Sequence, residues 1–339
     1  MPSLPDFSKM GFTHKGFHGV LNLFSACGPN PLLELKKVFG DSYAFTVYFV
    51  HDNYVEWYWH ADDMDRLGRK LIQKSAKDKA FLPKLRTLWE TRCRALEREF
   101  ALVEKTNLKT LSDAGLMAIY QKLLRAYLSE YAPSLGLQDA FSMRSEYHVE
   151  PVFKAFLADK GLSNEFNNFY PVLFAPVEPS FLSREHQDLL EIAVLIQKTG
   201  AQKVLLQNPA ALSSYPAIQK HLARHAKQYF WVKNNYANVQ ALDVPYFLAQ
   251  ALAEKSPATT LQKAKTAHAE AKRAKSALSK KLDISPAIQN LIRISELFSF
   301  MQDERKGYVL KSNHCQVNIL KEVAKRKQVS LNELLYVLP

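Results

Sequence analysis

Apolar residues recur three and four positions apart through most of the chain after residue 61, and this spacing constrains the fold more than any other feature. Met64, Leu67 and Leu71 show the pattern, which places such residues on one face of a helix. A longer segment with the same spacing is opened by Pro83 and extends to about Lys105. Only 11 of the 339 residues are glycine, which disfavours a turn-rich β architecture. The pattern predicts a mainly α fold, a multi-helix domain.

One strong strand signal interrupts this pattern near the N-terminus. Ala44–His51 and Tyr54–His60 are rich in aromatic and β-branched residues, and Asp52 and Asn53 separate them. Asparagine and aspartate tolerate the positive φ of a tight turn, so the two segments predict one small β-hairpin at about residues 44–60. A hairpin alone is marginally stable, and we therefore expect it to pack on helices.

The length of the chain predicts its domain organisation. A single domain holds about 100–200 residues, so we expect an N-terminal helical lobe with the hairpin over residues 1–200 and a C-terminal helical lobe over residues 201–339. Ser112 is the expected N-cap of a helix that reaches about Tyr131, and a separate helix is expected over residues 137–146. Near the end of the chain, Ser330 and Glu333 have the spacing of a capping box, which predicts one more short helix.

Cysteine usage and hydropathy bear on the compartment. Cys27, Cys93 and Cys315 are far apart and form no CxxC pair, which excludes a zinc ribbon and a thioredoxin-like motif. A low, odd cysteine count fits a reducing cytosol. The N-terminus lacks a basic stretch followed by an apolar core, and the most apolar window, Leu189–Ile196, is far shorter than the ~20 residues that cross a bilayer. We therefore expect a cytoplasmic protein with no membrane partner.

The formal net charge is +12, which permits nucleic acid, anionic membranes or phosphorylated ligands as partners but does not choose among them. Much of this charge lies in the predicted helix Ala258–Leu282. Its basic residues, against the single acid Glu270, are Lys263, Lys265, Lys272, Arg273, Lys275, Lys280 and Lys281. A seam at alternating three and four spacing predicts close packing on another helix, and it consists of Leu261, Ala264, His268, Ala271, Lys275, Leu278 and Leu282. A solvated face of a paired helix is one interpretation, and a basic helical module that binds nucleic acid or another polyanion is the alternative.

Two histidine pairs, His14/His18 and His221/His225, have a spacing of four, which places both rings on one face of a helix. Zinc needs three or four ligands, and no third ligand is apparent in the sequence. Neither pair carries the glutamate of the metalloprotease motif. A metal-dependent hydrolase built on His221 and His225 is therefore a further hypothesis, with a half-buried or surface histidine as the simpler explanation.

The stretch His225–Tyr236, HAKQYFWVKNNY, combines aromatic side chains with lysines and asparagines. Such a cluster offers apolar walls and hydrogen-bond donors to an anionic or polar ligand. The simpler interpretation is a tightly packed turn at the end of a helix. Phosphate-cradling loops of the GxGxxG or GxxxxGK[ST] type are missing from the sequence, and so is a GxSxG nucleophile elbow.

Two segments resemble the helical region of phosphoenolpyruvate-utilising enzymes, a family that includes phosphoenolpyruvate synthase, pyruvate phosphate dikinase and rifampicin phosphotransferase. Residues 225–248 carry a histidine, a tryptophan and an Asn-Tyr pair in the order typical of that family. Residues 295–339 carry an Arg-Lys pair, a helix of the form xxLKEVAKR and a capped short helix. The resemblance covers roughly residues 200–339. The residues that match, and that it marks as substrate-binding candidates, are His225, Trp231, Lys233, Asn234, Asn235, Tyr236, Arg305 and Lys306.

In that family, an ATP-grasp domain phosphorylates a histidine on a swivelling domain, which carries the phosphoryl group to the second substrate. This chain stops at Pro339, where the resemblance would place the start of the swivelling domain, and no segment resembles ATP-grasp. The resemblance thus implies a substrate-binding or linking helical domain, inactive alone, with an unknown small-molecule acceptor. ATP and magnesium are implied only for the two further domains, which would act in cis in a longer protein or in trans.

Overall fold

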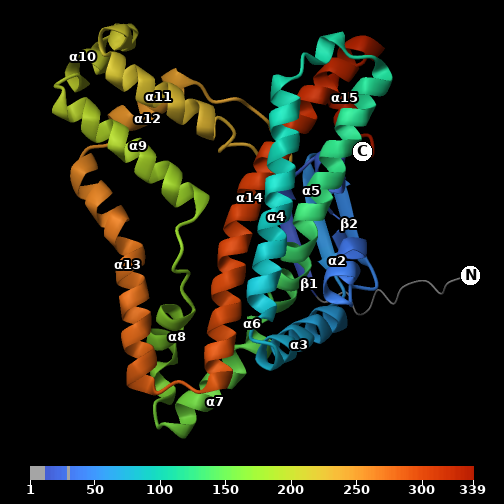
Figure 1. The fold of residues 1–339 in the computed structure, drawn as a ribbon, viewed down its shortest axis with the longest axis vertical. Coiled ribbons are helices and arrows are strands. Elements are labelled where there is room, and N and C mark those ends of the chain that lie inside the picture. Colours follow the sequence, from blue (N-terminus) through green and yellow to red (C-terminus); the bar gives the residue numbers. More distant parts are fainter. Residues whose placement is uncertain (1–11, 29–30) are drawn as a thin grey trace, which may run out of the picture.

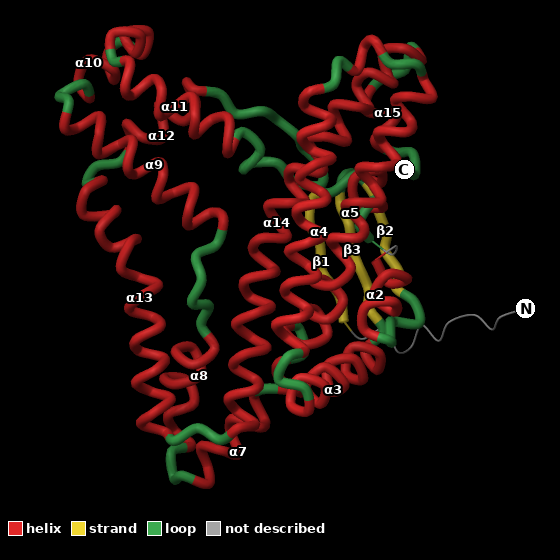
Figure 2. Tube along the Cα trace, viewed as in Figure 1, coloured by secondary structure: helices red, strands yellow, loops and turns green. Residues whose placement is uncertain are grey.

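The structure is a computed structural model that describes residues 12–28 and 31–339, and it confirms a mainly α fold with a small N-terminal sheet (Figures 1 and 2). The elements are β1 (Phe12–His18), α1 (Leu21–Ser25), α2 (Pro31–Phe39), β2 (Thr46–His51), β3 (Tyr54–Trp59), α3 (Ala61–Lys77), α4 (Phe81–Lys105), η2 (Leu108–Thr110), α5 (Asp113–Ser142), α6 (Ser145–His148), α7 (Glu150–Asp159), η3 (Ser163–Glu165), α8 (Phe166–Phe174), α9 (Phe181–Lys198), α10 (Gln202–Gln207), η4 (Pro209–Ser214), α11 (Pro216–Tyr229), α12 (Val244–Ala253), α13 (Pro257–Leu282), α14 (Pro286–Lys327) and α15 (Leu331–Leu335).

The sheet contains the predicted hairpin and one strand more. Strands β2 and β3 pair antiparallel, and Asp52 and Asn53 between them both have positive φ, at 46° and 63°. Strand β1 adds to the other edge of β3, which gives the order β1-β3-β2. Its register shifts between His14 and Phe17. That irregularity explains why the segment carries no clear strand pattern in the sequence.

Helix α5 differs from its prediction. The expected break near Tyr131 and the separate helix over residues 137–146 are wrong, because one helix runs from Asp113 to Ser142 and contains Pro133. Every residue from Glu130 to Phe141 is buried, and α5 packs against α2, α3, α4 and α14 at once. Burial on all sides stabilises the helix enough to tolerate the missing proline N–H donor.

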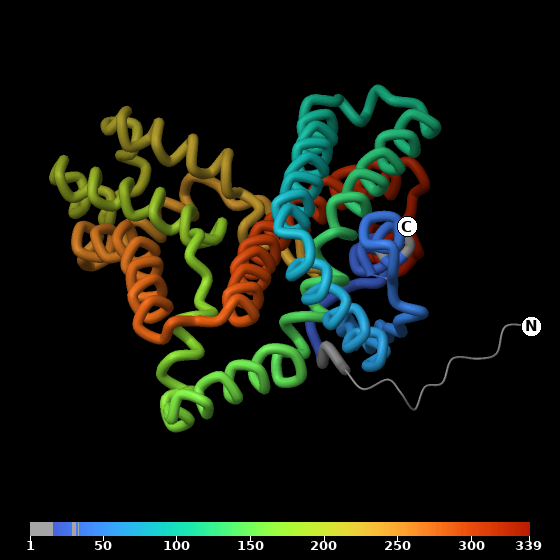
Figure 3. The backbone as a smooth tube through the Cα atoms, turned by 60° about the horizontal axis from the view of Figure 1, so that its bottom comes forward, coloured from blue at the N-terminus to red at the C-terminus, as the bar shows by residue number. Residues whose placement is uncertain are grey.

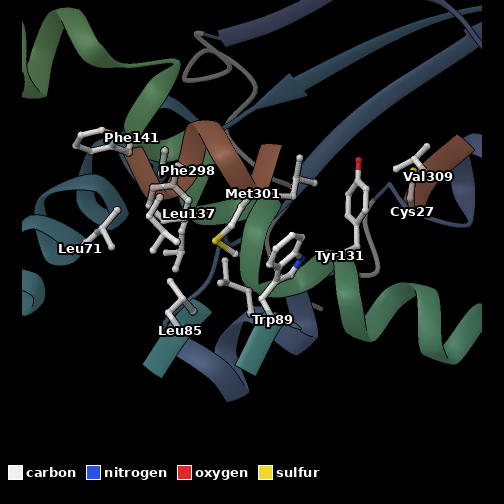
Figure 4. Close-up of a cluster of buried hydrophobic side chains, with 14 of the residues drawn as sticks. Cys27, Leu71, Leu85, Trp89, Tyr131, Leu137, Phe141, Phe298, Met301 and Val309 are labelled. Atoms are coloured by element: carbon white, nitrogen blue, oxygen red, sulfur yellow. The ribbon is translucent and has the colours of Figure 1, made fainter. Parts of the chain in front are cut away.

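Besides a minor hydrophobic cluster of Val20, Leu23 and Val317, the helices gather around two large ones. The larger one joins the sheet to α3, α4, α5, α7, α8 and α14, and Figure 4 shows Trp89, Phe298 and Met301 within it. The smaller one is formed by residues 181–252, in α9 to α12. Figures 1 and 3 show α9, α11, α12 and α13 standing as an arm apart from the α4, α5 and α14 bundle. The division into lobes at residue 200 stays a prediction.

Helix α13 packs through the predicted seam. All seven seam residues are buried or half-buried, and Gln187 of α9 donates to the Ala264 carbonyl oxygen at 3.2 Å. Lys275 is buried and its Nζ donates to the Ala175 carbonyl at 2.6 Å and to Glu296 of α14 at 2.8 Å. The other basic side chains of α13 are exposed. Within the described part of the chain, no helix combines the length and hydropathy needed to cross a membrane.

Candidate functional site

A cavity of about 470 Å³ lies where the sheet, α5, α14 and the loop after α11 meet. We call it the Arg305 pocket. Aromatic rings form much of its wall, and polar or charged side chains enter it from α5, α14 and the loop. The lining residues are Phe17, His18, Phe24, Trp57, Tyr131, Leu135, Asp139, Met143, Asn235, Tyr236, Gln302, Arg305, Lys306, Val309 and Leu310. Its size and mixed lining are those of a small-molecule site.

The loop that follows α11 closes one side of this pocket because it binds the sheet through its backbone. The Val20 N–H donates to the Tyr236 carbonyl oxygen at 2.9 Å. Gly19 permits this approach, since a Cβ at that position would lie 2.7 Å from the Val55 side chain and 3.3 Å from Tyr236. On the other side, Asn313 of α14 donates to the Asn235 carbonyl oxygen at 3.1 Å. The loop therefore holds Asn235 and Tyr236 in place.

Arg305 is the central charge of the site. Its side chain enters from α14, is only 6% exposed and lies over the Tyr131 ring, with 4.7 Å from guanidinium carbon to ring centroid. Nη2 donates to Gln138 Oε1 at 3.2 Å, and the buried Nε has no hydrogen-bond partner among the described residues. Burial alone would lower the pKa of Arg305, but surrounding groups that include Tyr131 and Asp139 hold it above its usual value. Arg305 is thus a buried cation that makes fewer hydrogen bonds than its five N–H donors allow.

Behind Arg305 lies the buried carboxyl group of Glu130, which is 0% exposed. Glu130 Oε1 accepts a hydrogen bond from Trp89 Nε1 at 2.7 Å, whereas Oε2 has no partner in the described residues. Burial raises the pKa of Glu130 to about 7, although the Trp89 hydrogen bond and the Arg305 charge each lower it. Buried carboxyls with raised pKa values are common at functional sites.

A phenol cluster lies beside the pocket. The Tyr131 and Tyr236 hydroxyl oxygens are 3.3 Å apart. The thiol of Cys27 is fully buried and donates to the Phe24 carbonyl at 3.2 Å. Burial raises the pKa of the Cys27 thiol, although hydrogen bonds from nearby tyrosine hydroxyls oppose the shift, and this disfavours the thiolate.

Comparisons of this chain with known proteins identify no relative. A scan of family models, a search of curated proteins and a search of solved structures each give no match. The resemblance to phosphoenolpyruvate-utilising enzymes therefore stays a prediction.

Four of the eight candidates from the sequence line the Arg305 pocket, and they are Asn235, Tyr236, Arg305 and Lys306. Asn234 is buried behind them, where it donates to the Leu310 carbonyl at 3.3 Å and accepts from the Gln240 N–H at 2.9 Å. It shapes the loop without lining the cavity. Lys233 is exposed and lies outside the Arg305 pocket.

The remaining two candidates lie in other places. Trp231 is buried against Gly307 of α14, and Lys311 Nζ lies 4.8 Å from its ring centroid in a separate cavity of about 250 Å³. His225 is buried in the smaller cluster, where its Nε2 lies 3.1 Å from Glu185 Oε1. Both residues therefore contribute to packing at the C-terminal end of α11 and do not line the Arg305 pocket.

The metal hypothesis receives no support from these positions. His221 is exposed on α11, whereas His225 is buried and bonded to Glu185. His14 and His18 belong to strand β1 and not to a helix, and the side chain of His14 lies outside the described residues. Across residues 12–28 and 31–339, no three His, Cys, Asp or Glu side chains gather in a group that could hold a metal ion.

A second apolar cavity of about 510 Å³ lies between α5, α14 and the C-terminal segment. Its two basic side chains are already paired, since Arg326 and Lys327 lie 3.0 and 2.8 Å from the carboxylate oxygens of Asp113. It therefore offers a ligand little unpaired charge, and the Arg305 pocket is the stronger candidate site.

Several residues of the site were missed in the sequence, chiefly Tyr131, Gln138 and Asp139 of α5. They lie on the part of α5 where the sequence predicted that one helix ends near Tyr131 and another begins near residue 137. A usable signal was present: Glu130, Ser134 and Gln138 recur every four residues inside an apolar helix. Such a polar stripe in an apolar helix is typical of a buried polar network, and all three residues are buried.

Proposed function

We propose that this chain is the substrate-binding helical part of a phosphotransferase of the phosphoenolpyruvate-utilising type. In this proposal, the Arg305 pocket holds the phosphoryl acceptor while a phosphohistidine domain docks at its mouth. The ATP-grasp domain would bind ATP and magnesium, and the swivelling domain would carry the phosphoryl group to the pocket. The chain alone is then expected to be inactive, because phosphoryl transfer needs metal-held phosphates.

One observation carries the proposal. The residues that resemble the family are about 70 positions apart in the sequence, in the stretch around Asn235 and in the Arg-Lys pair at Arg305, yet they line the same aromatic cavity. A purely structural role would not require these residues to line a cavity around a buried cation that has few hydrogen bonds.

Arg305 and Lys306 are neighbours in the sequence but differ in exposure, which suits two different roles. Arg305 is buried at the pocket wall, whereas the Lys306 side chain is 57% exposed and reaches the rim. Asp303 is its nearest acid, with 3.8 Å between Nζ and Oδ1. A mobile, solvent-facing ammonium can screen the charge of an incoming phosphoryl group.

The alternative of a polyanion-binding module rests on the exposed cations of α13. Lys263 and Lys272 are nine residues apart, so at ~100° per residue they lie on opposite sides of the helix. Lys265 is already paired with Glu191 at 2.8 Å. Lys265, Lys272, Arg273 and Lys280 nevertheless fall within about 100° of one another at ~100° per residue, so α13 keeps a basic face. Salt-dependent retention of the chain on heparin tests this alternative, and the absence of retention at moderate salt would remove it.

The test adds the two further domains that the proposal requires. The chain is mixed with the ATP-grasp and phosphohistidine domains of a phosphoenolpyruvate synthase-like enzyme, magnesium, radiolabelled ATP and the small-molecule fraction of a cell extract. We expect label to move to a small molecule only when the chain is present. The absence of any chain-dependent labelled product contradicts the proposed function.

Within that assay, Lys306→Ala is expected to lower the transfer rate about ten-fold, since one screening charge of roughly 1.4 kcal/mol is lost from the transition state. Lys325→Ala is the matched control, because Lys325 is an exposed lysine on the same helix and far from the pocket. It should transfer at the normal rate. Equal rates for both variants would show that Lys306 has no role at the rim.

A further inference from the structure

We infer that the ligand of the Arg305 pocket is an aryl carboxylate, with its carboxylate on Arg305 and its ring between the aromatic walls. This inference takes its choice of site from the proposed function and adds the chemical class of the acceptor. It rests on the bonding of Arg305, on the charges of the lining and on the arrangement of the rings.

The bonding of Arg305 calls for an anion. A guanidinium has five N–H donors, and in the described structure this one makes a single hydrogen bond, to Gln138 Oε1. Its Nε and the neighbouring Gln138 Nε2 are both buried without a partner. Leaving such donors unpaired is costly, and a planar carboxylate matches the fork of an arginine in two parallel bonds. The Tyr131 ring beneath the guanidinium fixes the orientation of that fork.

The charges of the lining disfavour a ligand with several negative charges. Two basic side chains, Arg305 and Lys306, face one carboxyl group, that of Asp139. Glu130, which is buried and outside the lining, is a second acid whose charge helps to raise the pKa of Arg305. A nucleoside triphosphate would bring several negative charges and usually needs a backbone cradle or metal, so the pocket is poorly suited to it.

The walls favour an aromatic body. Phe24 lies edge-on to Trp57 and to Tyr236, with ring centroids 5.2 and 5.8 Å apart, and Phe17 lies 5.6 Å from Tyr236. Rings held in tilted and edge-on positions offer both faces and edges to another ring. A sugar would leave many hydroxyls against these apolar surfaces without partners. A planar ring with one carboxylate satisfies both the walls and the arginine.

The experiment measures binding to the whole chain by isothermal titration calorimetry at pH 7.5, with 2-naphthoate as the probe. The neutral isostere 2-naphthamide tests the charge, and nonanoate tests the ring. We expect 2-naphthoate to bind about ten-fold or more tightly than either. Equal affinity for the acid and the amide, or no binding of the acid, overturns the inference. Nonanoate that binds as tightly as 2-naphthoate overturns its aromatic part.

Variants of the chain test whether the carboxylate of the ligand binds Arg305. Arg305→Met keeps much of the volume and should remove the preference for acid over amide, whereas binding of the amide persists. Arg293→Met is the matched control on α14, since Arg293 donates to the Lys79 carbonyl far from the pocket. It should keep the full preference. If Arg305→Met does not fold, the comparison of acid and amide on the unaltered chain still decides.

The two proposals fail separately. Chain-dependent phosphoryl transfer to a small molecule without binding of 2-naphthoate overturns the aryl carboxylate and leaves the proposed function standing. Arginine-dependent binding of 2-naphthoate without any transfer leaves the ligand class standing and removes the phosphotransferase.

Discussion

Trp89→Ala is expected to lower the free energy of unfolding by about 4–8 kcal/mol. Trp89 of α4 is 2% exposed, and its ring makes edge contacts with Phe300 and Tyr308 of α14, at centroid distances of 5.9 and 6.3 Å. Its loss removes buried area and leaves a cavity, which costs about 3–5 kcal/mol for a large aromatic residue. It also removes the strong donor to Glu130 Oε1 and leaves that buried oxygen only the long 4.0 Å contact with Cys93 Sγ, which costs about 1–3 kcal/mol more.

Urea unfolding followed by circular dichroism measures this effect. Leu88→Ala is the control on the same helix, because Leu88 is 36% exposed and should cost less than about 1 kcal/mol. Trp89→Phe keeps a ring but loses the indole N–H, so it should fall between the two. A loss below about 2 kcal/mol for Trp89→Ala would contradict the packing described between α4 and α14.

Glu130→Gln is expected to stabilise the protein at neutral and higher pH by about 3 kcal/mol and to leave it nearly unchanged below pH 4.5. The pKa of Glu130 is about 7 in the folded chain, against an ordinary value of 4.5. The folded state therefore holds a proton that the unfolded state releases. The stability that Glu130 contributes is present below pH 4.5 and is lost as pH rises to about 7, at roughly 1.4 kcal/mol per unit of pKa difference.

The measurement is the difference in unfolding free energy between Glu130→Gln and the unaltered chain at several pH values. Taking the difference removes other titrations, such as that of His314, whose pKa burial lowers to about 4. Glu270→Gln, at an exposed position of α13, should show no such slope. A difference that does not change between pH 4.5 and 7.5 would mean that Glu130 is not a buried carboxyl of raised pKa.

Local signals predicted those elements that local chemistry determines. The hairpin turn at Asp52 and Asn53, the α13 seam and the capping box of Ser330 and Glu333 all agree with the structure. The course of α5 through Pro133 did not follow from the sequence, because it depends on burial by four neighbouring helices. Strand β1 likewise exists only through its pairing with β3.

In the candidate site, too, the sequence identified individual residues but not their arrangement in space. Asn235, Tyr236, Arg305 and Lys306 could be singled out because their segments have a recognisable composition. Their meeting in one cavity depends on Gly19, which lets the loop reach the sheet. Trp231, although part of the same cluster in sequence, packs on the opposite side of α14, against Gly307, because a turn separates it from Asn235.

The most direct test of the Arg305 pocket as the substrate site is a crystal structure of the chain with 2-naphthoate. We expect the ring among Trp57, Tyr131 and Tyr236, and the carboxylate oxygens about 2.7–2.9 Å from the Arg305 guanidinium nitrogens. An empty Arg305 pocket, with the ligand in the apolar cavity between α5, α14 and the C-terminal segment, would contradict the account.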